Sequence, residues 1–473
     1  MAEKPPPGPG FNVDAPPPYE KAAPSGQPQA QQPAGQPQQA PWKLSYADFW
    51  PNKLTDSGLF SLPTFEPFGA CMQRANQWLQ QNPNVEVILC ESAEERIEYG
   101  GTINPEKTYF HVSGKFRTLF VRGLRLWFGL RLTPGPPLQI SYINTVPGMI
   151  RGGGFLREAQ FERLPQVLDG LNKMFKENPL PGKIINIETQ DMKLDAQWSG
   201  NMSIAPDQSV FSDGGDHGVF YLFVIRVFYV CGPPAYEEVG MVDFSPRCLS
   251  AGGMMKMPSF QGFSAATYQA AQWIQQYQQS IRITNIQSID IKMNMRGFGS
   301  GNLTVDNQAM SFYEYGKMST CYIRNVRVCY TKPFNGAPPS PAPPIALAVK
   351  VFYPVQLSNV GMLSMPSFET FSQTMQRAGA WLQVVGRRVI SVETVPVFMT
   401  VYEHMAQHGG GNGAECSMMI GGGDNMTSYQ FVIRVYLDGP YQEPPAEVLP
   451  PLPPSAQNVT HWTQENRKTC RLM

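Results

Sequence analysis

The pattern of apolar and polar residues along the chain repeats four times. Three segments begin with nearly the same phrase, Leu62-Pro63-Thr64-Phe65, Met257-Pro258-Ser259-Phe260 and Met365-Pro366-Ser367-Phe368, and a diverged copy starts near Phe161. Counted from this Phe, apolar or small residues recur at positions 3, 10, 13 and 14. These positions share one face of an α-helix. We therefore predict that each copy opens at this Phe with an amphipathic helix of about four turns.

Two strands recur after each predicted helix. The first carries a Glu or Gln and lies at residues 88–92, 185–189, 284–288 and 390–394. The second reads apolar-Arg-apolar and lies at residues 124–127, 225–228, 326–329 and 433–436. The stretch between them is rich in Gly, Asn and Asp and varies in length, so we expect one more strand or hairpin and a variable loop. Apolar stretches at 138–146 and 346–355 predict a further strand before the next helix.

The spacing of the copies sets the size of the repeating unit. The first Phe residues of successive copies stand 96, 99 and 108 residues apart, which is long enough for a small domain and too long for a short-repeat solenoid. The predicted fold class is α+β, with four tandem diverged repeats, each a mostly antiparallel sheet with one amphipathic helix, between disordered Pro-rich tails. The predicted divisions are a Pro/Gln-rich arm (1–41), unit 1 (42–136), unit 2 (137–234), unit 3 (235–333), a Pro-rich linker (334–344), unit 4 (345–440) and a Pro-rich tail (441–473).

The recurring Arg and Glu/Gln residues allow two interpretations. Four Arg at equivalent strand positions could line four ligand sites. Alternatively, each Arg faces solvent or pairs with the Glu or Gln of a neighbouring strand, as is usual in half-exposed sheets. We favour the second interpretation. The Trp residues at helix position 13, Trp78, Trp273 and Trp381, are expected in the core.

Composition and charge exclude some classes of function. Lys plus Arg and Asp plus Glu both total 37, so the formal net charge of zero gives no electrostatic case for binding nucleic acid. The first residues lack the apolar core of a signal peptide, and the apolar run at 219–231 is interrupted by Arg226 and too short to span a bilayer. We therefore expect a cytoplasmic protein with reduced cysteines.

The body of the chain offers few candidates for chemistry. His404 and His408 stand four apart near Glu403 and Cys416, but Gly409-Gly410-Gly411 follows directly, so a solvated loop is favoured over a metal site. The runs Gly152–Gly154 and Gly421–Gly423 lack the Lys-Ser/Thr of a phosphate loop. We find no nucleophile with a recognisable base, so neither a catalytic residue, a cofactor site nor a metal site is predicted.

The two tails carry motifs that indicate partners. Pro16-Pro17-Pro18-Tyr19 resembles the PPxY ligand of WW domains, in which a polyproline II turn presents Pro16, Pro17 and Tyr19 to an aromatic groove. Cys470-Arg471-Leu472-Met473 resembles a CaaX prenylation box, and its terminal Met favours farnesyl on Cys470. A second PPxY match, at 233–236, falls at a repeat junction and is interpreted as a linker.

These observations lead to two hypotheses of function. The first is a non-enzymatic, membrane-associated adaptor that is farnesylated at Cys470, lies peripherally on a cytoplasmic membrane face and binds a WW-domain protein through its PPxY motif. One lipid chain gives only reversible attachment. The alternative is a soluble ligand-binding repeat protein, or an unrecognised enzyme, with its site in the Gly-rich loops at 95–118, 195–217, 294–318 and 399–427.

Overall fold

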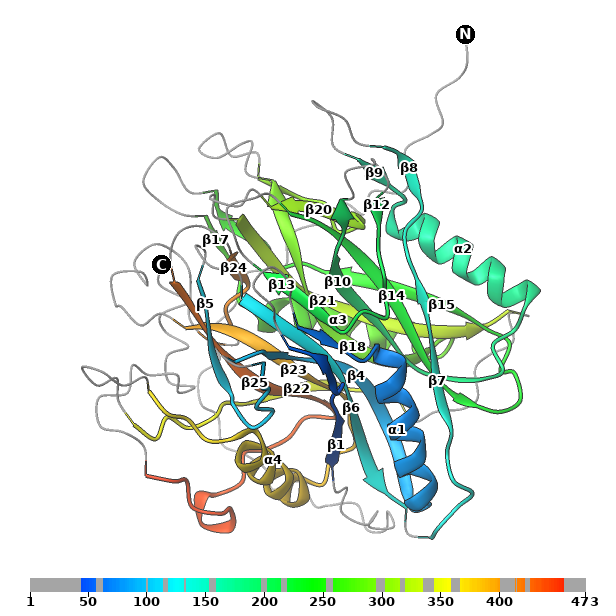
Figure 1. Ribbon diagram of the computed structural model, residues 1–473. Coiled ribbons are helices and arrows are strands. Elements are labelled where there is room, and N and C mark those ends of the chain that lie inside the picture. Colours follow the sequence, from blue (N-terminus) through cyan, green and yellow to red (C-terminus); the bar gives the residue numbers. More distant parts are fainter. Residues whose placement is uncertain are drawn as a thin grey trace. The chain divides into compact units, whose positions relative to one another are not determined.

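Each repeat is built from the same series of elements (Figure 1). A first strand leads through a small hairpin into one helix, and two long antiparallel strands follow. The computed structural model describes residues 44–56, 63–98, 101–113, 118–131, 133–152, 159–196, 202–213, 219–251, 258–294, 303–314, 320–334, 344–358, 366–399, 413, 415–421 and 426–454. Residues 41–473 group into one compact unit.

The equivalent elements of the four units are as follows. The first strands are β1 (Ser45–Phe49), β7 (Ile140–Thr145), β15 (Glu237–Phe244) and β22 (Leu347–Phe352). The helices are α1 (Phe68–Gln81), α2 (Leu164–Glu177), α3 (Phe263–Tyr277) and α4 (Phe371–Val385). The inner strands are β4 (Val85–Arg96), β10 (Gly182–Lys193), β18 (Arg282–Asn294) and β23 (Val389–Met399). The middle strands are β6 (Thr118–Leu130), β14 (Val219–Cys231), β21 (Thr320–Pro333) and β25 (Met426–Asp438).

Short elements complete each unit. The hairpins before the helices pair β2 (Lys53–Thr55) with β3 (Thr64–Phe65), β8 (Met149–Arg151) with β9 (Gln160–Phe161), and β16 (Cys248–Ser250) with β17 (Ser259–Phe260); in unit 4 a single bridge joins Gln356 and Phe368. The arm strands are β5 (Tyr109–Ser113), β13 (Val210–Asp213), β20 (Ser311–Glu314) and β24 (Met418–Gly421). The remaining pieces are β11 (Asp195–Ala196), β12 (Met202–Ser203), β19 (Thr304–Val305) and the 3-10 helix η1 (Ala446–Val448).

The predicted repeat of antiparallel sheets with one helix each is confirmed, but the helices begin later than the pattern indicated. Phe65 and its equivalents lie in the small hairpins, and each helix starts three residues further on, at Phe68, Leu164, Phe263 and Phe371. Pro67 directly precedes α1, and its fixed φ suits the residue that enters a helix. The face predicted from positions 3, 10 and 14 is buried in all four helices.

The units are joined by exchange of strands. Arm strand β13 of unit 2 pairs with β6 of unit 1, β20 of unit 3 pairs with β14 of unit 2, and β24 of unit 4 pairs with β21 of unit 3. Arm strand β5 of unit 1 pairs with β25 of unit 4, which closes the series into a ring of four sheets. Each sheet therefore has a strand that belongs to the next unit.

Each helix fills the space between its own sheet and the next one. The apolar face of α1 packs on β6 and also on Ile140 and Phe228 of unit 2, and the core around α4 includes Leu44 and Trp127 of unit 1. The cores around α2 and α3 likewise include residues of the following unit. Every core is therefore shared by two units, which explains why residues 41–473 form one compact unit although each repeat is long enough for a small domain.

The beginning of the predicted C-terminal tail lies against helix α4. The ring of Tyr441 meets Trp381 edge to face, and Glu443 accepts a hydrogen bond of 2.9 Å from Trp381 Nε1. Trp381 is buried, whereas Trp78 and Trp273 are only partly covered. For residues 441–454 the structure therefore differs from the expected free tail. No helix in the described parts of the chain is long and apolar enough to cross a bilayer.

Candidate functional site

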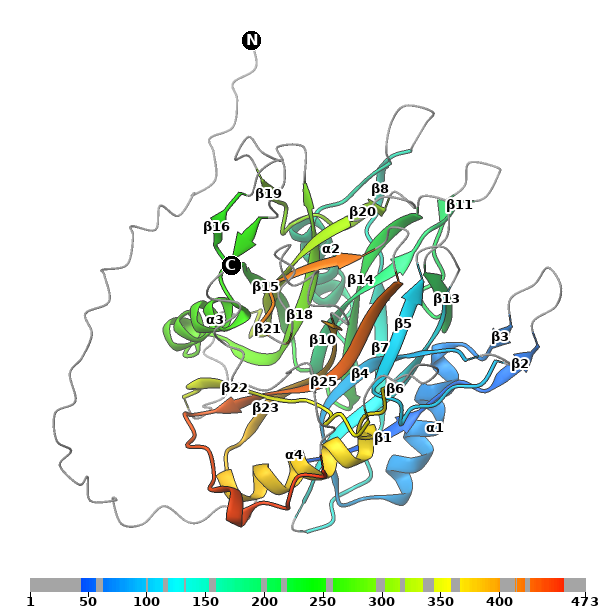
Figure 2. The same ribbon diagram turned by 90° about the vertical axis from the view of Figure 1, so that its left-hand side faces the viewer.

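The recurring Glu/Gln and Arg residues form a buried polar layer around the ring axis. The predicted cross-strand pairing is found, because Glu91, Glu188, Gln287 and Glu393 stand opposite Arg125, Arg226, Arg327 and Arg434 in the strand registers. The prediction that these Arg could face solvent is wrong, since all four are almost completely buried. The layer lies between the inner strands, which occupy the middle of Figure 2 with α1, α3 and α4 outside them.

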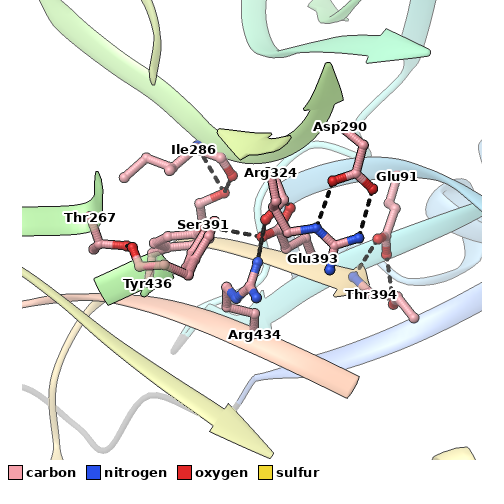
Figure 3. Close-up of polar contacts among 12 residues, drawn as sticks. Glu91, Thr267, Ile286, Asp290, Arg324, Ser391, Glu393, Thr394, Arg434 and Tyr436 are labelled. Atoms are coloured by element: carbon pink, nitrogen blue, oxygen red, sulfur yellow. Dashed lines mark hydrogen bonds and ion pairs between the residues drawn. The ribbon is translucent and has the colours of Figure 1, made fainter. Parts of the chain in front are cut away.

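Each member of this layer binds the preceding unit as well as its own. Glu188 Oε1 accepts a hydrogen bond from the backbone N–H of Ser92 at 3.0 Å, and Glu188 Oε2 accepts one from Ser92 Oγ at 2.7 Å. Arg226 donates to the same Ser92 Oγ at 2.7 Å. Equivalent contacts join units 2 and 3, units 3 and 4, and units 4 and 1. The last of these junctions includes the bonds from Thr394 to Glu91 in Figure 3.

A second repeated contact fixes three of the four junctions. Asn186 accepts a hydrogen bond from the N–H of Cys90 and donates one to the Cys90 carbonyl, both at 2.9 Å. Asn285 and Ser391 hold the next two units in the same way. At the closing junction the equivalent residue is Leu89, which packs in the core with Val392 instead. These side chains satisfy inner-strand groups that have no partner strand on that side.

The arms from the next unit also cap the helices. The N–H of Phe68 donates to the carbonyl of Asp207, and the first residues of α2, α3 and α4 donate to Gln308, Glu415 and Glu106 at 2.9–3.0 Å. The Glu106 carboxylate also accepts a hydrogen bond from the N–H of Ser372 at 3.0 Å and one from its hydroxyl. The hydrogen bonds to Ser372 hold the pKa of Glu106 below its usual value although partial burial opposes them.

An axial cavity of about 370 Å³ opens beside the polar layer. Its wall is formed by the inner strands of all four units and by aromatic residues from the middle and arm strands. Three aromatic pairs stack across strands with centroids 4.9–5.5 Å apart: Phe120–Phe211, Tyr221–Phe312 and Tyr429–Phe110. At the fourth position Tyr322 stands opposite Met419. We call these eight residues the aromatic collar.

Three carboxylates face the cavity from one equivalent position of the inner strands. They are Glu94, Asp191 and Asp290, and Pro396 takes the place in unit 4. Arg122 donates to Glu94 Oε1 at 2.9 Å through Nε, and Arg324 binds both oxygens of Asp290 at 2.8 and 2.7 Å (Figure 3). Asp191 is exposed to the cavity, yet the surrounding protein and the nearby Glu94 raise its pKa to about 6.

Other ionisable groups near the cavity are also perturbed by burial. Burial raises the pKa of Glu91 to about 7, against the opposing effects of Arg125 and the Thr394 N–H. Burial raises the pKa of Glu95 well above its usual value, which favours the neutral acid there. Among the described residues no cluster of three or more His, Cys, Asp and Glu side chains is placed to hold a metal ion.

The structure places the residues predicted from motifs away from this cavity or outside its description. Cys470 and the motif residues Pro16, Pro17 and Tyr19 lie outside the described residues, as do His404 and His408. Cys416 is buried and donates to the Met418 carbonyl. The second PPxY match, at 233–236, lies on an exposed turn, where Tyr236 has a φ of 51°.

Sequence reasoning missed the cavity although two signals for it are present. An aromatic residue stands five positions before each recurring Arg, at Phe120, Tyr221, Tyr322 and Tyr429. A carboxylate stands three positions after the recurring Glu or Gln in three copies. Comparisons of the chain with protein-family models, with curated protein sequences and with solved structures give no match.

Proposed function

We propose that the ring is a binding protein and that its axial cavity is the site of a small organic ligand. The observation that carries the proposal is the cavity itself, of about 370 Å³, with the aromatic collar and carboxylates in its wall. A cavity that gathers apolar surface and a few polar groups from several elements is the usual form of a small-molecule site.

The surroundings of the cavity favour binding over catalysis. The hydroxyls nearest the polar layer are engaged, since Ser92 Oγ donates to Glu188 and accepts from Arg226. Ser288 Oγ donates to Glu393 in the same way, at 2.6 Å. A nucleophilic hydroxyl needs an adjacent general base that is free to take its proton. Here each of the carboxylates Glu91, Glu188 and Glu393 accepts hydrogen bonds from at least two donors and holds neighbouring units together.

The test is recovery of the ligand with the protein. The full chain is purified under mild conditions from a eukaryotic cell and examined by native mass spectrometry, beside the variant Ala93→Phe. Ala93 is buried in the cavity wall, so the larger ring would occupy ligand space. We expect a non-covalent adduct on the wild type that is released on denaturation and missing from Ala93→Phe. An adduct that persists in a folded Ala93→Phe protein would place the ligand elsewhere and contradict the proposal.

The adaptor hypothesis remains a separate proposal that the sequence motifs support. In it, a farnesyl group on Cys470 attaches the ring to a membrane face, and residues 16–19 bind a WW-domain protein. Intact mass of the protein from eukaryotic cells, compared with Cys470→Ser, tests the lipid. Membrane fractionation that is unchanged in Cys470→Ser would contradict the attachment.

A further inference from the structure

The charges that a ligand meets in the axial cavity are negative. The side chains of Glu94 and Asp290 are 36% and 34% exposed, whereas Arg122 and Arg324, which bind them, are only 3% and 2% exposed. The arginines therefore lie behind their carboxylates. A molecule in the cavity would contact carboxylate oxygens and ring faces before it reached a guanidinium group.

Asp191 differs from the other two carboxylates because it is unpaired. No ion pair and no hydrogen bond from another side chain engages its carboxylate within the described parts of the chain; Arg122 donates to the Asp191 backbone carbonyl at 3.2 Å, and the charge of Arg122 and the Asp191 N–H partly offset the rise in pKa that burial causes. The Asp191 side chain is exposed, so its carboxylate is accessible to a molecule in the cavity. The pKa of about 6, raised by burial, leaves Asp191 largely ionised at neutral pH. A bound cation would supply the missing partner.

The residue before Asp191 also lacks a partner. Gln190 is 7% exposed and lines the cavity. Its Oε1 atom is buried and accepts no hydrogen bond from the described residues. A buried amide oxygen without a donor costs free energy, but this atom has almost no accessible surface, so a ligand in the cavity does not reach it. Gln190 and Asp191 are successive residues of β10 and point to opposite faces of the sheet, so Asp191 is the acceptor that a ligand in the cavity meets.

The rings beside Asp191 suit the rest of such a ligand. Asp191 stands opposite Phe223 in the strand register, and the stacked pair Tyr221–Phe312 begins two residues away. Ring faces attract cations and cover apolar groups, and this attraction is strongest where water is excluded. Asp191 and the rings therefore favour one kind of molecule, a carbon skeleton with a positively charged nitrogen.

We infer that the axial cavity binds a small organic ammonium ion, with its nitrogen at Asp191 and its skeleton against the aromatic collar. This inference rests on the proposed function and adds the class of ligand. Carboxylate-bearing ligands are excluded from this position, because they would place a second negative charge beside Asp191 and the exposed oxygens of Glu94 and Asp290.

Three probes of one shape and different charge test the inference. Phenethylammonium, 2-phenylethanol and phenylacetate share a phenyl ring and a short chain, and they carry a positive charge, no charge and a negative charge at neutral pH. Isothermal titration calorimetry at pH 7.5 measures each with the full chain. We expect phenethylammonium to bind at least about tenfold more tightly than the alcohol, from its ion pair and its contact with ring faces. Phenylacetate should bind most weakly.

Two variants locate the effect. Asp191→Asn should lower the affinity for phenethylammonium to about that for the alcohol and leave the affinity for the alcohol unchanged. This change frees no arginine, because Asp191 has no ion pair in the described chain, and the thermal midpoint reports whether the variant is folded. The matched control is Asp169→Asn, on the exposed surface of helix α2, which should leave all three affinities unchanged.

The outcomes separate this inference from the proposed function. Equal affinity for phenethylammonium and 2-phenylethanol, both lost in Ala93→Phe, would overturn the ammonium inference and leave the cavity as a binding site. A preference for the ammonium ion that survives in Asp191→Asn would overturn the assignment to Asp191. If none of the three probes binds, the ammonium inference is overturned, and the native mass measurement decides separately whether the cavity has another ligand.

Discussion

The polar layer and the wall of the axial cavity lie on the same four inner strands and differ in how they repeat. In the polar layer, Glu or Gln, Ser or Thr, and Arg occur at equivalent positions in all four units and bind one another across every junction. Three residues further along the strands, the wall carries Glu94, Asp191, Asp290 and Pro396, and their contacts all differ.

This difference shows that, in a chain of repeats, the residues that join the units can repeat while the residues that line a cavity do not. Closing a ring of four units requires the same junction four times, so its chemistry repeats. A ligand that lies on the axis is not four-fold symmetric, and a site that fits it must break the repeat. Departures from the repeat within a single chain therefore coincide with the site that we propose, and the following experiments sharpen or break that comparison.

The largest loss of unfolding free energy is expected when a buried charge beside the polar layer loses its partner. Arg327 is 1% exposed and binds both oxygens of Asp243, at 2.7 and 2.6 Å. In Arg327→Ala the Asp243 carboxylate would be buried without a partner, which should cost about 3–5 kcal/mol of unfolding free energy. Urea denaturation gives the midpoint and slope.

The matched control removes both charges. In unit 4, Val351 stands opposite Arg434 where Asp243 stands opposite Arg327. The double variant Arg327→Met, Asp243→Val should therefore recover most of the lost stability. A double variant as unstable as Arg327→Ala would mean that the charge pair is not the source of the loss.

A smaller loss of unfolding free energy is expected when the junction of units 1 and 2 receives the apolar residue found at the junction of units 4 and 1. Asn186→Leu places at the first junction the residue found at Leu89, and it leaves the N–H and carbonyl of Cys90 without their partners. The expected cost is about 3 kcal/mol, again measured by urea denaturation. Asn186→Ser is the control, because Ser391 makes both bonds at its own junction. Equal losses in the two variants would show that these hydrogen bonds contribute little.

The pH dependence of stability should reflect one carboxyl group from the polar layer, Glu91, and one from the cavity wall, Asp191. The pKa of Glu91 is raised by burial to about 7 and that of Asp191 to about 6, both above their values in an unfolded chain. The folded protein therefore binds more protons than the unfolded chain at mildly acidic pH, and this contribution is lost as pH rises through 6 and 7. We expect the protein to be about 2 kcal/mol less stable at pH 8 than at pH 5, measured by urea denaturation.

Two variants divide this pH effect between the regions. Glu91→Gln is acceptable to the fold, because Gln287 occupies the equivalent position in unit 3, and it should reduce the dependence. Asp191→Asn should reduce it further below pH 7, and the part that remains belongs to other buried carboxyls such as Glu95. A dependence that is unchanged when both substitutions are combined would assign it to other groups.

The smallest change in stability is expected in the cavity wall, and there the variant should be more stable than the wild type. Asp191→Asn removes a carboxylate whose pKa is raised by burial, so the variant should be more stable than the wild type at pH 7.5. The gain should be only about 1 kcal/mol, because the side chain is open to the cavity. A thermal melt without added ligand measures it. A destabilised Asp191→Asn would place Asp191 among the residues that hold the ring.

Much of the fold could be predicted from local pattern, and its errors have physical causes. Apolar periodicity located the helices but placed their starts too early. Phe65 lies in the hairpin before α1, yet a residue at its position would also fall on the apolar face of a longer helix, so the pattern could not separate the two cases. The Arg were expected at half-exposed sites, since a single sheet has one solvent face. The preceding unit covers that face in the ring, and Arg226 of unit 2 lies under Phe68 of unit 1 at 3.9 Å from the ring centroid.

The sequence by itself determined that there are four units, the order of their elements and the pairing of each Glu or Gln with an Arg, because these depend on residues close together or on a period that recurs in every copy. Only the tertiary structure decided that each arm strand joins the preceding sheet, that β5 closes the ring on β25, and that Asp191 and the aromatic collar meet at one cavity. Those contacts join residues about one unit or more apart, such as Glu91 and Thr394 across 303 residues. Which sheet edge an arm meets depends on how packed helices orient neighbouring units, and no local pattern records that orientation.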